Sequence, residues 1–376
     1  MNILFIVPSY KPAYIYGGPI VSVAMLAEHL VQVGNEVTVY TTTANGKTEL
    51  EVPVEEPVMM NGVKIIYFKR ITKDHTHVSP RLWKALYKNV KQFDVVHMHS
   101  WWNFLVLGAA FICKLKGVKP VLSPRGMLCD YVFNTHNSGK KKLLHNLIGK
   151  RLLASTYLHV TSDIEWNECL TINNKWKGGT IFNIVELPEK RYVRKENDVF
   201  TIGFLSRVDG KKGLDILLNA LSGINFNYQL RIAGSGDPEY IETLKQQIFS
   251  LAIEDKVEWV GWKKGEEKYD FLAETDLFAL TSHNENFAMV VIESLCVGTP
   301  VLISEHVGLA GYVKENNLGW ITTIKNVDDV RNQLTAAYNE KEERSRITGE
   351  AIGIINRDFN GAKLAKDYVN FYQEIQ

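Results

Sequence analysis

The chain has 376 residues, of which 45% are hydrophobic, and a formal net charge of +1 at pH 7. This length predicts two domains of ordinary size, each able to bury its own core. A net charge so close to zero argues against a nucleic-acid-binding protein, because binding to phosphate backbones requires an excess of basic side chains.

The sequence predicts a cytoplasmic protein. Its cysteines lack the spacing of a metal site or a disulfide framework, which suits a reducing compartment, and we expect no metal and no cofactor. They are Cys113, Cys129, Cys169 and Cys296. The N-terminus lacks the basic segment and the long apolar core of a signal peptide. The longest apolar stretch, residues 104–113, is far shorter than the roughly 20 residues of a membrane span.

The chain begins with a predicted strand, loop and helix. Residues 3–7 form a continuous apolar run that is typical of a buried parallel strand, and Gly17-Gly18-Pro19 opens a helix over residues 20–33. Glycines at a helix N-terminus let an anionic group approach the backbone. A simple turn is the alternative for a lone Gly-Gly pair.

Two later segments of the first half carry candidate site residues. The strand predicted at residues 93–100 has His99 near its end, and active sites of open α/β sheets gather at the carboxyl ends of strands. A hydrogen-bonded structural histidine is the alternative. Trp101 and Trp102 follow, and either stack on an acceptor sugar or pack in the core. Arg125, in a Ser-Pro-Arg-Gly-Met segment, could hold a phosphate or a sugar hydroxyl.

Residues 140–153 alternate lysines and leucines at helical spacing. Such a basic amphipathic helix either presents a solvated face over a buried stripe or lies on an anionic membrane surface. We favour the solvated face. Peripheral contact with the inner membrane face is the alternative, because a lipid-linked acceptor would require it.

The second half opens with a charged stretch, residues 189–198, that is predicted to link the domains. A strand at residues 200–206 ends at Arg207, and Lys212 follows five residues later. Two cations that converge at a strand end can neutralise a diphosphate leaving group without a divalent metal. Two solvated cations in a turn are the alternative.

A Gly-x-Gly turn starts at Gly234, after a strand predicted at residues 230–233. It lacks the third glycine of a dinucleotide fingerprint, so NAD binding is not expected. A loop is predicted at residues 44–62. Further strands are predicted at residues 37–40, 63–68, 257–262, 277–281 and 299–304. Alternating strands and helices in both halves predict two parallel, helix-flanked sheets.

Two carboxylates, Glu285 and Glu293, are separated by seven residues near the C-terminal third. A helix predicted at residues 289–297 places Glu285 before its N-terminus and Glu293 inside it. Unsatisfied amides at a helix N-terminus form an anion site. The residues at that N-terminus are Asn286, Phe287, Ala288 and Met289. A carboxylate, an anion site and a second carboxylate match a sugar, a diphosphate and a ribose, whereas two solvated helix charges are the alternative.

This glutamate pair resembles the Glu-x7-Glu motif of family-4 retaining glycosyltransferases, which have the GT-B architecture. The segments around His99, around Arg125 and over residues 207–213 are similar to segments of the same family. The chain departs from the family pattern at four positions where glycine is usual. These are Ile184, Ser206, Asn286 and Ala288.

The resemblance implies an α/β protein of two Rossmann-like parallel-sheet domains that face each other across a cleft. Residues 1–188, completed by a C-terminal helix at 360–376, would form the acceptor-side domain, and residues 189–359 the nucleotide-sugar donor-binding domain. The implied reaction is metal-independent transfer of a hexose-type sugar, with retention, from a nucleotide diphosphate sugar to a saccharide or lipid-linked saccharide acceptor.

The resemblance also implies roles for the candidate residues. Arg207, Lys212 and the amides of residues 286–289 would stabilise the departing diphosphate. Glu293 would hold the ribose hydroxyls and Glu285 the donor sugar. The expected catalytic set is Glu285, Arg207, Lys212, His99 and Arg125. The expected donor-binding set is Gly17, Gly18, Gly234, Asn286, Phe287, Ala288, Met289 and Glu293.

Two other classes of protein share such an architecture. A nucleotide-sugar epimerase would consume the donor without an acceptor and should show further acid and base groups facing the sugar. A catalytically silent homologue would bind nucleotide without turnover, a hypothesis motivated by Ile184, Asn286 and Ala288. The intact pairs of glutamates and of cations favour the transferase.

Overall fold

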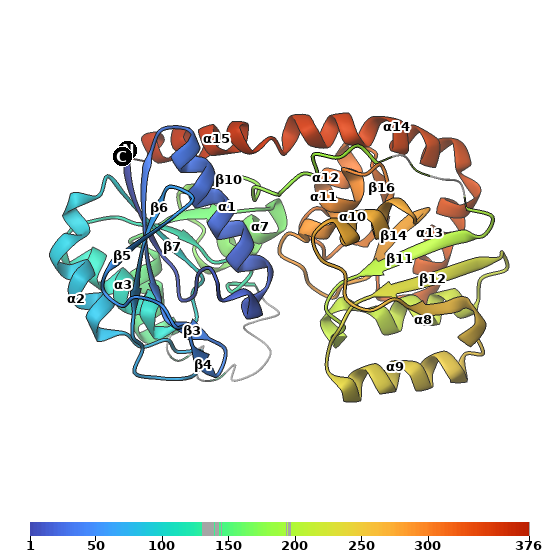
Figure 1. Ribbon diagram of the computed structural model, residues 1–376, viewed down its shortest axis with the longest axis horizontal. Helices are drawn as coiled ribbons and strands as arrows, with labels where there is room; N and C mark the ends of the chain where they lie inside the picture. Colours follow the sequence, from blue (N-terminus) through green and yellow to red (C-terminus); the bar gives the residue numbers. More distant parts are fainter. Residues whose placement is uncertain (130–138, 140–142, 144, 193, 195–196, 376) are drawn as a thin grey trace. The chain divides into compact units, whose positions relative to one another are not determined.

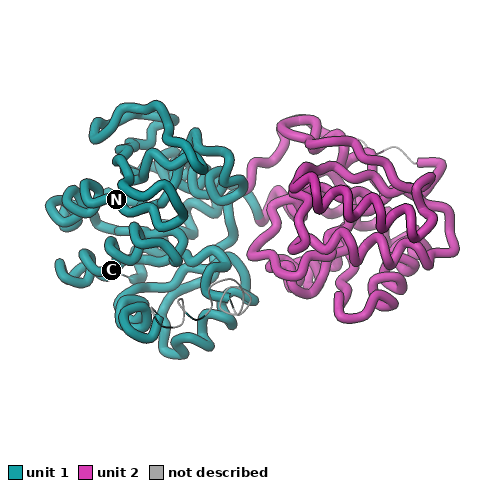
Figure 2. The backbone as a smooth tube through the Cα atoms, turned by 90° about the horizontal axis from the view of Figure 1, so that it is seen from below, with its two compact units in different colours: residues 1–184, 359–376 teal, residues 185–358 magenta. Residues whose placement is uncertain are grey.

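The computed structural model describes residues 1–129, 139, 143, 145–192, 194 and 197–375. The chain divides into two compact units (Figure 2). Unit 1 comprises Met1–Ile184 and Phe359–Gln376, and unit 2 comprises Val185–Asp358. The sequence predicts domain boundaries after residues 188 and 359, whereas these units divide after residues 184 and 358.

Unit 1 is built on an eight-stranded sheet of order β10-β9-β8-β7-β1-β2-β6-β5, in which only the β5–β6 pairing is antiparallel. Its strands are β1 (Asn2–Ile6), β2 (Glu36–Thr42), β5 (Pro57–Met60), β6 (Val63–Phe68), β7 (Val95–His99), β8 (Val121–Ser123), β9 (Tyr157–Val160) and β10 (Gly178–Thr180). A separate antiparallel pair consists of β3 (Ala44–Asn45) and β4 (Thr48–Glu49).

The helices of unit 1 pack around this sheet. Within the described residues they are α1 (Gly18–Gln32), α2 (Pro80–Asn89), α3 (Phe104–Leu115), α6 (Lys150–Leu153), α7 (Asp163–Ile172) and α15 (Gly361–Glu374), with short 3-10 helices at η1 (Tyr14–Tyr16) and η2 (Val90–Gln92) and a short π-helix at η3 (His145–Gly149). The C-terminal α15 lies beside α1 (Figure 1). The two helices meet closely at Gly361, where a Cβ atom would lie 2.2 Å from Nε2 of His29.

Unit 2 is built on a six-stranded, all-parallel sheet of order β13-β12-β11-β14-β15-β16. Its strands are β11 (Phe200–Leu205), β12 (Tyr228–Ala233), β13 (Val257–Trp259), β14 (Leu277–Leu280), β15 (Val301–Ser304) and β16 (Gly319–Thr322). Its helices are α8 (Leu214–Ser222), α9 (Pro238–Ser250), α10 (Glu266–Ala273), α11 (Met289–Leu295), α12 (Ala310–Glu315), α13 (Val327–Asn339) and α14 (Lys341–Asp358), with turns at η4 (Gly210–Lys212) and η5 (Glu254–Lys256).

Helices flank both faces of the second sheet. Helix α8 contacts α9 and α13, whereas α11 contacts α10 and α14 (Figure 1). The central strands β11 and β14 are buried along their whole length, as expected for a parallel sheet covered on both sides. The predicted α/β class with two Rossmann-like parallel-sheet domains is thus confirmed.

The strand order of each unit fixes where its loops can form a site. In unit 1 the winding direction reverses between β1 and β7, and in unit 2 between β11 and β14. Ligands of open α/β sheets bind beside the carboxyl ends of the strands at such a reversal. The loops after β1 and β7, and those after β11 and β14, are the segments that carry most of the predicted site residues.

Two sequence predictions need correction or restriction. The loop predicted at residues 44–62 contains β3, β4 and β5, which have only two to four residues each and therefore give a weak hydrophobic signal. In the predicted amphipathic helix 140–153, residues 140–142 and 144 lie outside the described residues. Its described end buries Leu152 and Leu153 but exposes Leu147 and Ile148, so the stripe is only partly buried.

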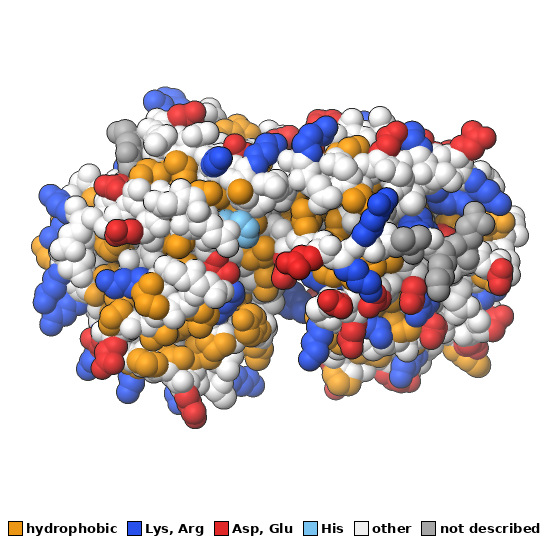
Figure 3. Space-filling view, turned by 45° about the horizontal axis from the view of Figure 1, so that its top comes forward, with side chains coloured by type: hydrophobic (Ala, Val, Ile, Leu, Met, Phe, Trp, Pro, Cys, Tyr) orange, Lys and Arg blue, Asp and Glu red, His pale blue; other side chains and the backbone are white. Residues whose placement is uncertain are grey.

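The surface carries charges of both signs. On the face drawn in Figure 3, basic and acidic side chains are interspersed over both units, in keeping with the net charge of +1. All four cysteines are buried, and none of them forms a disulfide bond. Within the described ranges, no helix combines the length and apolarity needed to cross a bilayer.

Candidate active site

The loop after β11 is held against the end of β14 by a glycine. Gly213 adopts a left-handed φ of 67°, and a Cβ atom there would lie 2.0 Å from the carbonyl oxygen of Thr281. The Thr281 hydroxyl donates to the Gly213 carbonyl at 2.7 Å, and the His283 amide donates to the Lys211 carbonyl at 2.9 Å. These contacts bring Lys212 next to the segment that follows β14.

Glu285 is fixed by its backbone on both sides. Its amide donates to the carbonyl of His306 at 3.0 Å, and its carbonyl accepts from the amide of Gly308 at 2.7 Å. Since both partners belong to the loop after β15, the carboxylate of Glu285 projects from a backbone that two neighbouring strand ends hold in place.

Lys212 and Glu285 form an ion pair in which Nζ donates to Oε2. The two side chains are only 14% and 20% exposed, so the pair is partly shielded from solvent. Arg207 lies in the same loop, but its side chain is 71% exposed and its recorded ion pair is a long one, 3.8 Å to Asp209. The structure therefore joins Lys212 to Glu285 and leaves Arg207 at the surface.

The second glutamate is paired as well. Glu293 lies in α11, is buried, and its Oε1 accepts from Nζ of Lys268 at 2.6 Å. Lys268 stands among other charged residues at the start of α10, and no sequence pattern distinguishes it from them. The pairing of Lys268 with Glu293 is seen only in the structure, where α10 contacts α11.

Helix α11 begins at Met289, with Ala288 as its N-cap. Ala288 keeps a left-handed φ of 66°, the conformation that a glycine would adopt without strain. The predicted segment 286–289 thus lies at the N-terminus of α11, where the first amides have no acceptor within the helix. The backbone conformation typical of glycine is present although the residue is alanine.

Gly234 supports the loop that carries Arg207. A Cβ atom at Gly234 would lie 2.4 Å from the carbonyl oxygen of Ser206. The Val208 amide donates to the Ser235 carbonyl at 2.9 Å, so the two loops pair side by side. The close approach of the two backbones accounts for a glycine at this position.

In unit 1, Arg125 connects the predicted residues. Its Nε donates to Nδ1 of His99 at 3.3 Å, and its Nη1 donates to Oγ of Ser22 and to Oδ1 of Asn183, both at 3.1 Å. Ser22 lies early in α1, whose N-terminus is formed by Gly17 and Gly18. Four segments of the chain therefore meet at one guanidinium group.

Arg125 and His99 present hydrogen-bond donors without acceptors. His99 is 2% exposed, and burial, followed by the charges of His97 and Arg125, holds its pKa well below the ordinary value. The ring is therefore neutral at pH 7, and because Nδ1 accepts from Arg125, its proton lies on Nε2. Both Nε2 of His99 and Nη2 of Arg125 are buried and have no hydrogen-bond partner within the described part of the chain. Two such donors can bind hydroxyl or phosphate oxygens.

A chain of hydrogen bonds lies beneath these residues. It runs from the Tyr372 hydroxyl to Nδ1 of His97 (2.7 Å), from Nε2 of His97 to Oγ of Ser123 (2.6 Å), from Ser123 to Nδ1 of His159 (2.6 Å) and from Nε2 of His159 to the carbonyl of Ile181 (3.1 Å). The carbonyl can only accept, so His159 donates through Nε2 and accepts through Nδ1.

That assignment fixes every other proton of the chain. Ser123 donates to His159 and accepts from His97, whose Nδ1 then accepts from Tyr372. Burial holds the pKa of His97 well below its ordinary value and lowers that of His159 to about 3. The His97 ring lies against His99, with centroids 4.2 Å apart. Neutral rings of defined tautomer therefore hold His99 in place.

The tryptophans after β7 belong to the core. Trp101 is fully buried, and the Trp102 indole donates to the carbonyl of Met127 at 2.6 Å. Of the two sequence interpretations, the structure favours core packing for Trp101. Ile184, where the family usually has glycine, is 1% exposed and is not among the residues with positive φ.

The comparisons with known proteins agree with this geometry. Residues 16–167 match the family described as Glycosyltransferase Family 4, and residues 188–352 match Glycosyl transferases group 1. The chain is 26% identical over 402 residues to an uncharacterized glycosyltransferase of Methanocaldococcus jannaschii, covering 99% of this chain and 98% of that protein. It is 26% identical over 333 residues to mannosylfructose-phosphate synthase of Agrobacterium fabrum, covering 78% and 72% respectively.

Solved structures share the fold at low sequence identity. Sucrose-phosphate synthase from Thermosynechococcus elongatus aligns with a TM-score of 0.76 at 16% identity, over 100% of this chain and 99% of that one. Anabaena HepE in complex with UDP and glucose aligns with a TM-score of 0.73 at 18% identity, over 100% of both chains. Together with the family matches to both halves, these results identify the chain as an enzyme, a family-4 glycosyltransferase with the GT-B fold.

Proposed function

We propose that this enzyme transfers a hexose-type sugar, with retention of configuration and without a metal, from a nucleotide diphosphate sugar to a saccharide or lipid-linked saccharide. The observation that carries the proposal is the Lys212–Glu285 ion pair at the point where the winding of the second sheet reverses. It stands beside the N-terminus of α11 and so combines a cation, helix amides and a carboxylate.

Charge development during the reaction explains these groups. When the bond to the transferred sugar breaks, the leaving diphosphate gains negative charge, which Lys212 and the amides of residues 286–289 would stabilise. Arg207, exposed in the same loop, would turn from Asp209 toward the phosphates. Since Lys212 contacts only one oxygen of Glu285, the other oxygen can accept a hydroxyl of the donor sugar.

Glu293 has the corresponding arrangement for the nucleoside. Its Oε1 is paired with Lys268, and its Oε2 can accept from the ribose hydroxyls. To unit 1 we assign contacts with the transferred sugar, because His99 Nε2 and Arg125 Nη2 are buried donors that a sugar hydroxyl would satisfy. Gly17 and Gly18, at the N-terminus of α1, would face the donor phosphates.

A lipid-linked acceptor is favoured by exposed apolar side chains on unit 1. Phe104, Phe111 and Leu115 of α3 are exposed, as are Leu147 and Ile148, and α3 contacts α6. Basic side chains such as Lys114 and Lys150 belong to the same helices, which suits an anionic lipid surface. Sedimentation with phosphatidylglycerol vesicles, compared between wild type and Phe111→Ser, tests this part of the proposal.

The donor is tested by thermal unfolding with UDP-, GDP- and ADP-sugars, with and without EDTA. A ligand at about 100 times its Kd should raise the free energy of unfolding by about 2.7 kcal/mol. We expect one nucleotide class to stabilise the wild type equally in EDTA. Glu293→Ala should lose this effect, whereas Glu315→Ala, which changes an exposed glutamate of unit 2, should keep it.

Product analysis separates the transferase from its alternatives. NMR of the product should show the anomeric configuration of the donor and a requirement for an acceptor. Consumption of the donor without an acceptor would indicate an epimerase, and stabilisation by nucleotide without any turnover would indicate a silent homologue. Stabilisation by no nucleotide sugar would contradict the donor assignment.

A further inference from the structure

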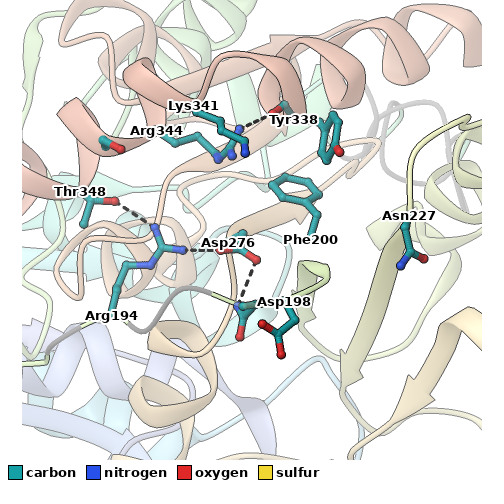
Figure 4. Close-up of a pocket in the computed structure, with 11 residues that line it drawn as sticks. Arg194, Asp198, Phe200, Asn227, Asp276, Tyr338, Lys341, Arg344 and Thr348 are labelled. Carbon is teal, nitrogen blue, oxygen red and sulfur yellow. Dashed lines mark hydrogen bonds and ion pairs between the residues drawn. The ribbon is translucent and has the colours of Figure 1, made fainter.

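Unit 2 contains a pocket at the amino ends of its strands. Lys212 and Glu285 lie at the other end of the same sheet, after the carboxyl ends of the strands. The pocket has a volume of about 470 Å³, which is in the range of small-molecule sites. Its sheet-edge residues stand at the start of β11 and just before β12 and β14, and the remainder come from α13, α14 and the segment before β11 (Figure 4). They are Arg194, Asn197, Asp198, Phe200, Asn227, Asp276, Tyr338, Lys341, Arg344, Ser345 and Thr348.

The pocket is spatially separate from the residues that are proposed to bind the nucleotide sugar. Lys212 and Glu285 follow the carboxyl ends of β11 and β14, whereas Phe200 and Asp276 mark their amino ends. At roughly 3.3 Å per residue, a strand of six residues such as β11 separates the two edges by roughly 20 Å. A ligand in the pocket would not touch the Lys212–Glu285 pair.

Arg194 forms one wall and has an unused donor. Its Nη1 donates to the Thr348 hydroxyl at 2.9 Å, and its Nη2 donates to the Thr275 carbonyl at 2.7 Å and to Asp276 at 3.2 Å. The side chain is only 14% exposed, yet its Nε is buried and has no hydrogen-bond partner among the residues that the structure describes. A buried donor of a charged group that lacks an acceptor is costly, and an acceptor supplied by a ligand would remove that cost.

Two further cations approach the same space. Figure 4 shows Lys341 and Arg344 reaching down from α14 toward Asp276. Arg344 Nη1 donates to the carbonyls of Ala337 and Tyr338 at the end of α13, and its guanidinium lies 5.0 Å from the ring centre of Phe200. Lys341 is exposed and forms no ion pair or hydrogen bond with any residue that the structure describes.

The carboxylates of the pocket do not balance these cations. Asp276 is already saturated, because it accepts from Arg194, from the amide of Thr201 at 2.8 Å and from Asn197 at 3.0 Å. Asp198 is exposed at the rim. Among the described lining residues, three cations thus face two carboxylates, and one of these, Asp276, is already occupied by donors of the protein itself.

We propose that this pocket binds the phosphate group of a small phosphorylated molecule, held by Arg194, Lys341 and Arg344. Guanidinium groups suit phosphate because their N–H donors match its oxygens in pairs. A purely structural role of Arg194, in which it only holds α14 against the end of the sheet, would explain the hydrogen bonds of its Nη1 and Nη2. It would not account for the unpaired Nε, for the free Lys341 or for the open volume.

The proposal is tested by calorimetric titration of the full-length protein with inorganic phosphate and with glucose 6-phosphate, with glucose as the uncharged control. We expect both phosphates to bind and glucose not to. Lys341→Gln should raise the Kd about three- to tenfold, which is the effect of losing one partly exposed charged contact. Its matched control, Lys325→Gln, changes the exposed lysine just before α13 and should leave the Kd unchanged. Asp198→Asn removes a negative charge that repels phosphate, and it should therefore lower the Kd.

A phosphate could also occupy the proposed diphosphate site, and Lys212→Ala separates the two locations. Binding that is kept in Lys212→Ala and weakened in Lys341→Gln supports the pocket. Binding that is lost in Lys212→Ala but equal in Lys341→Gln and wild type overturns the proposal, as does the absence of phosphate binding. Arg344→Gln should lower affinity further, but it also removes contacts with α13, so Lys341→Gln decides the test.

Discussion

The two units hold their candidate site residues by opposite means. In unit 1, His99 and Arg125 are buried and are oriented by hydrogen bonds among neutral rings and hydroxyls. In unit 2, Glu285 and Glu293 are each oriented by a lysine in a partly shielded ion pair. The first arrangement depends on protons that stay on fixed atoms, whereas the second depends on charges that a bound ligand can share.

This difference has a physical basis in what each group would contact. A carboxylate paired with lysine keeps a free oxygen and can exchange part of its interaction for a ligand, at little cost where solvent still reaches it. A buried imidazole has no such freedom, because burial disfavours its charged form. We therefore expect unit 1 to respond to pH and unit 2 to respond to changes of single charges.

The largest expected effect is a loss of stability of unit 1 in mild acid. In the unfolded chain a histidine binds a proton near pH 6.5, whereas in the folded chain the pKa values of His97, His99 and His159 are lowered. The unfolded state then binds more protons, so stability is full above pH 6.5 and falls as the pH is lowered toward the folded values. Each histidine contributes at most about 1.4 kcal/mol per pH unit, so the three together contribute at most about 4 kcal/mol per pH unit below pH 6.5.

Hydrogen exchange at pH 7.5 and 5.5 measures this effect in each unit of the full-length chain. Protection of amides in β7 and β9 should fall at the lower pH, while that of β11 and β12 should hold. An equal fall in both sheets would contradict the assignment of the pH response to the histidines of unit 1.

The next effect concerns the charges of unit 2. Lys212→Ala should lower kcat about 10²- to 10³-fold, since one donor to a developing anion is worth about 3 kcal/mol. Stability should change little, because Glu285 is 20% exposed even with Lys212 in place, so water can reach its carboxylate when the lysine is removed. Lys264→Ala, which removes an exposed lysine of the same unit, is the matched control. A comparable loss in the control, or a large drop in the melting temperature, would argue against a direct role of Lys212.

The sequence could predict the sheets and the helix carrying Glu293, because long apolar runs and helix signals are local. It could place His99 at a strand end and select Arg125 from the Ser-Pro-Arg-Gly-Met segment, but it could not show that the two side chains meet. Their contacts with Ser22 and Asn183 connect segments that are far apart in the chain and carry no mutual signal. Lys268 was missed for the same reason.

A smaller effect is expected from the hydroxyl that begins the histidine chain. Tyr372→Phe leaves Nδ1 of His97 as a buried acceptor without a donor, which should cost about 1–3 kcal/mol in urea unfolding. Tyr368→Phe on the same helix is the control, because that hydroxyl makes only a long contact of 3.5 Å with the Phe182 carbonyl. Equal losses from both substitutions would show that ring packing, and not the hydrogen bond to His97, matters.

The smallest effect has the opposite sign and tests whether unit 2 keeps the backbone of its family at the start of α11. Ala288 adopts a φ of 66°, which costs an L-residue about 1–2 kcal/mol, so Ala288→Gly relieves strain while adding freedom to the unfolded chain. The net gain should be about 0.5 kcal/mol in the free energy of unfolding. Ala351→Gly is the control, since Ala351 is also buried but lies in the middle of α14, where glycine should lose about 0.5–1 kcal/mol. Because the two substitutions are chemically identical, opposite signs can arise only from the left-handed backbone at Ala288, and equal losses would place that residue in an ordinary helical conformation.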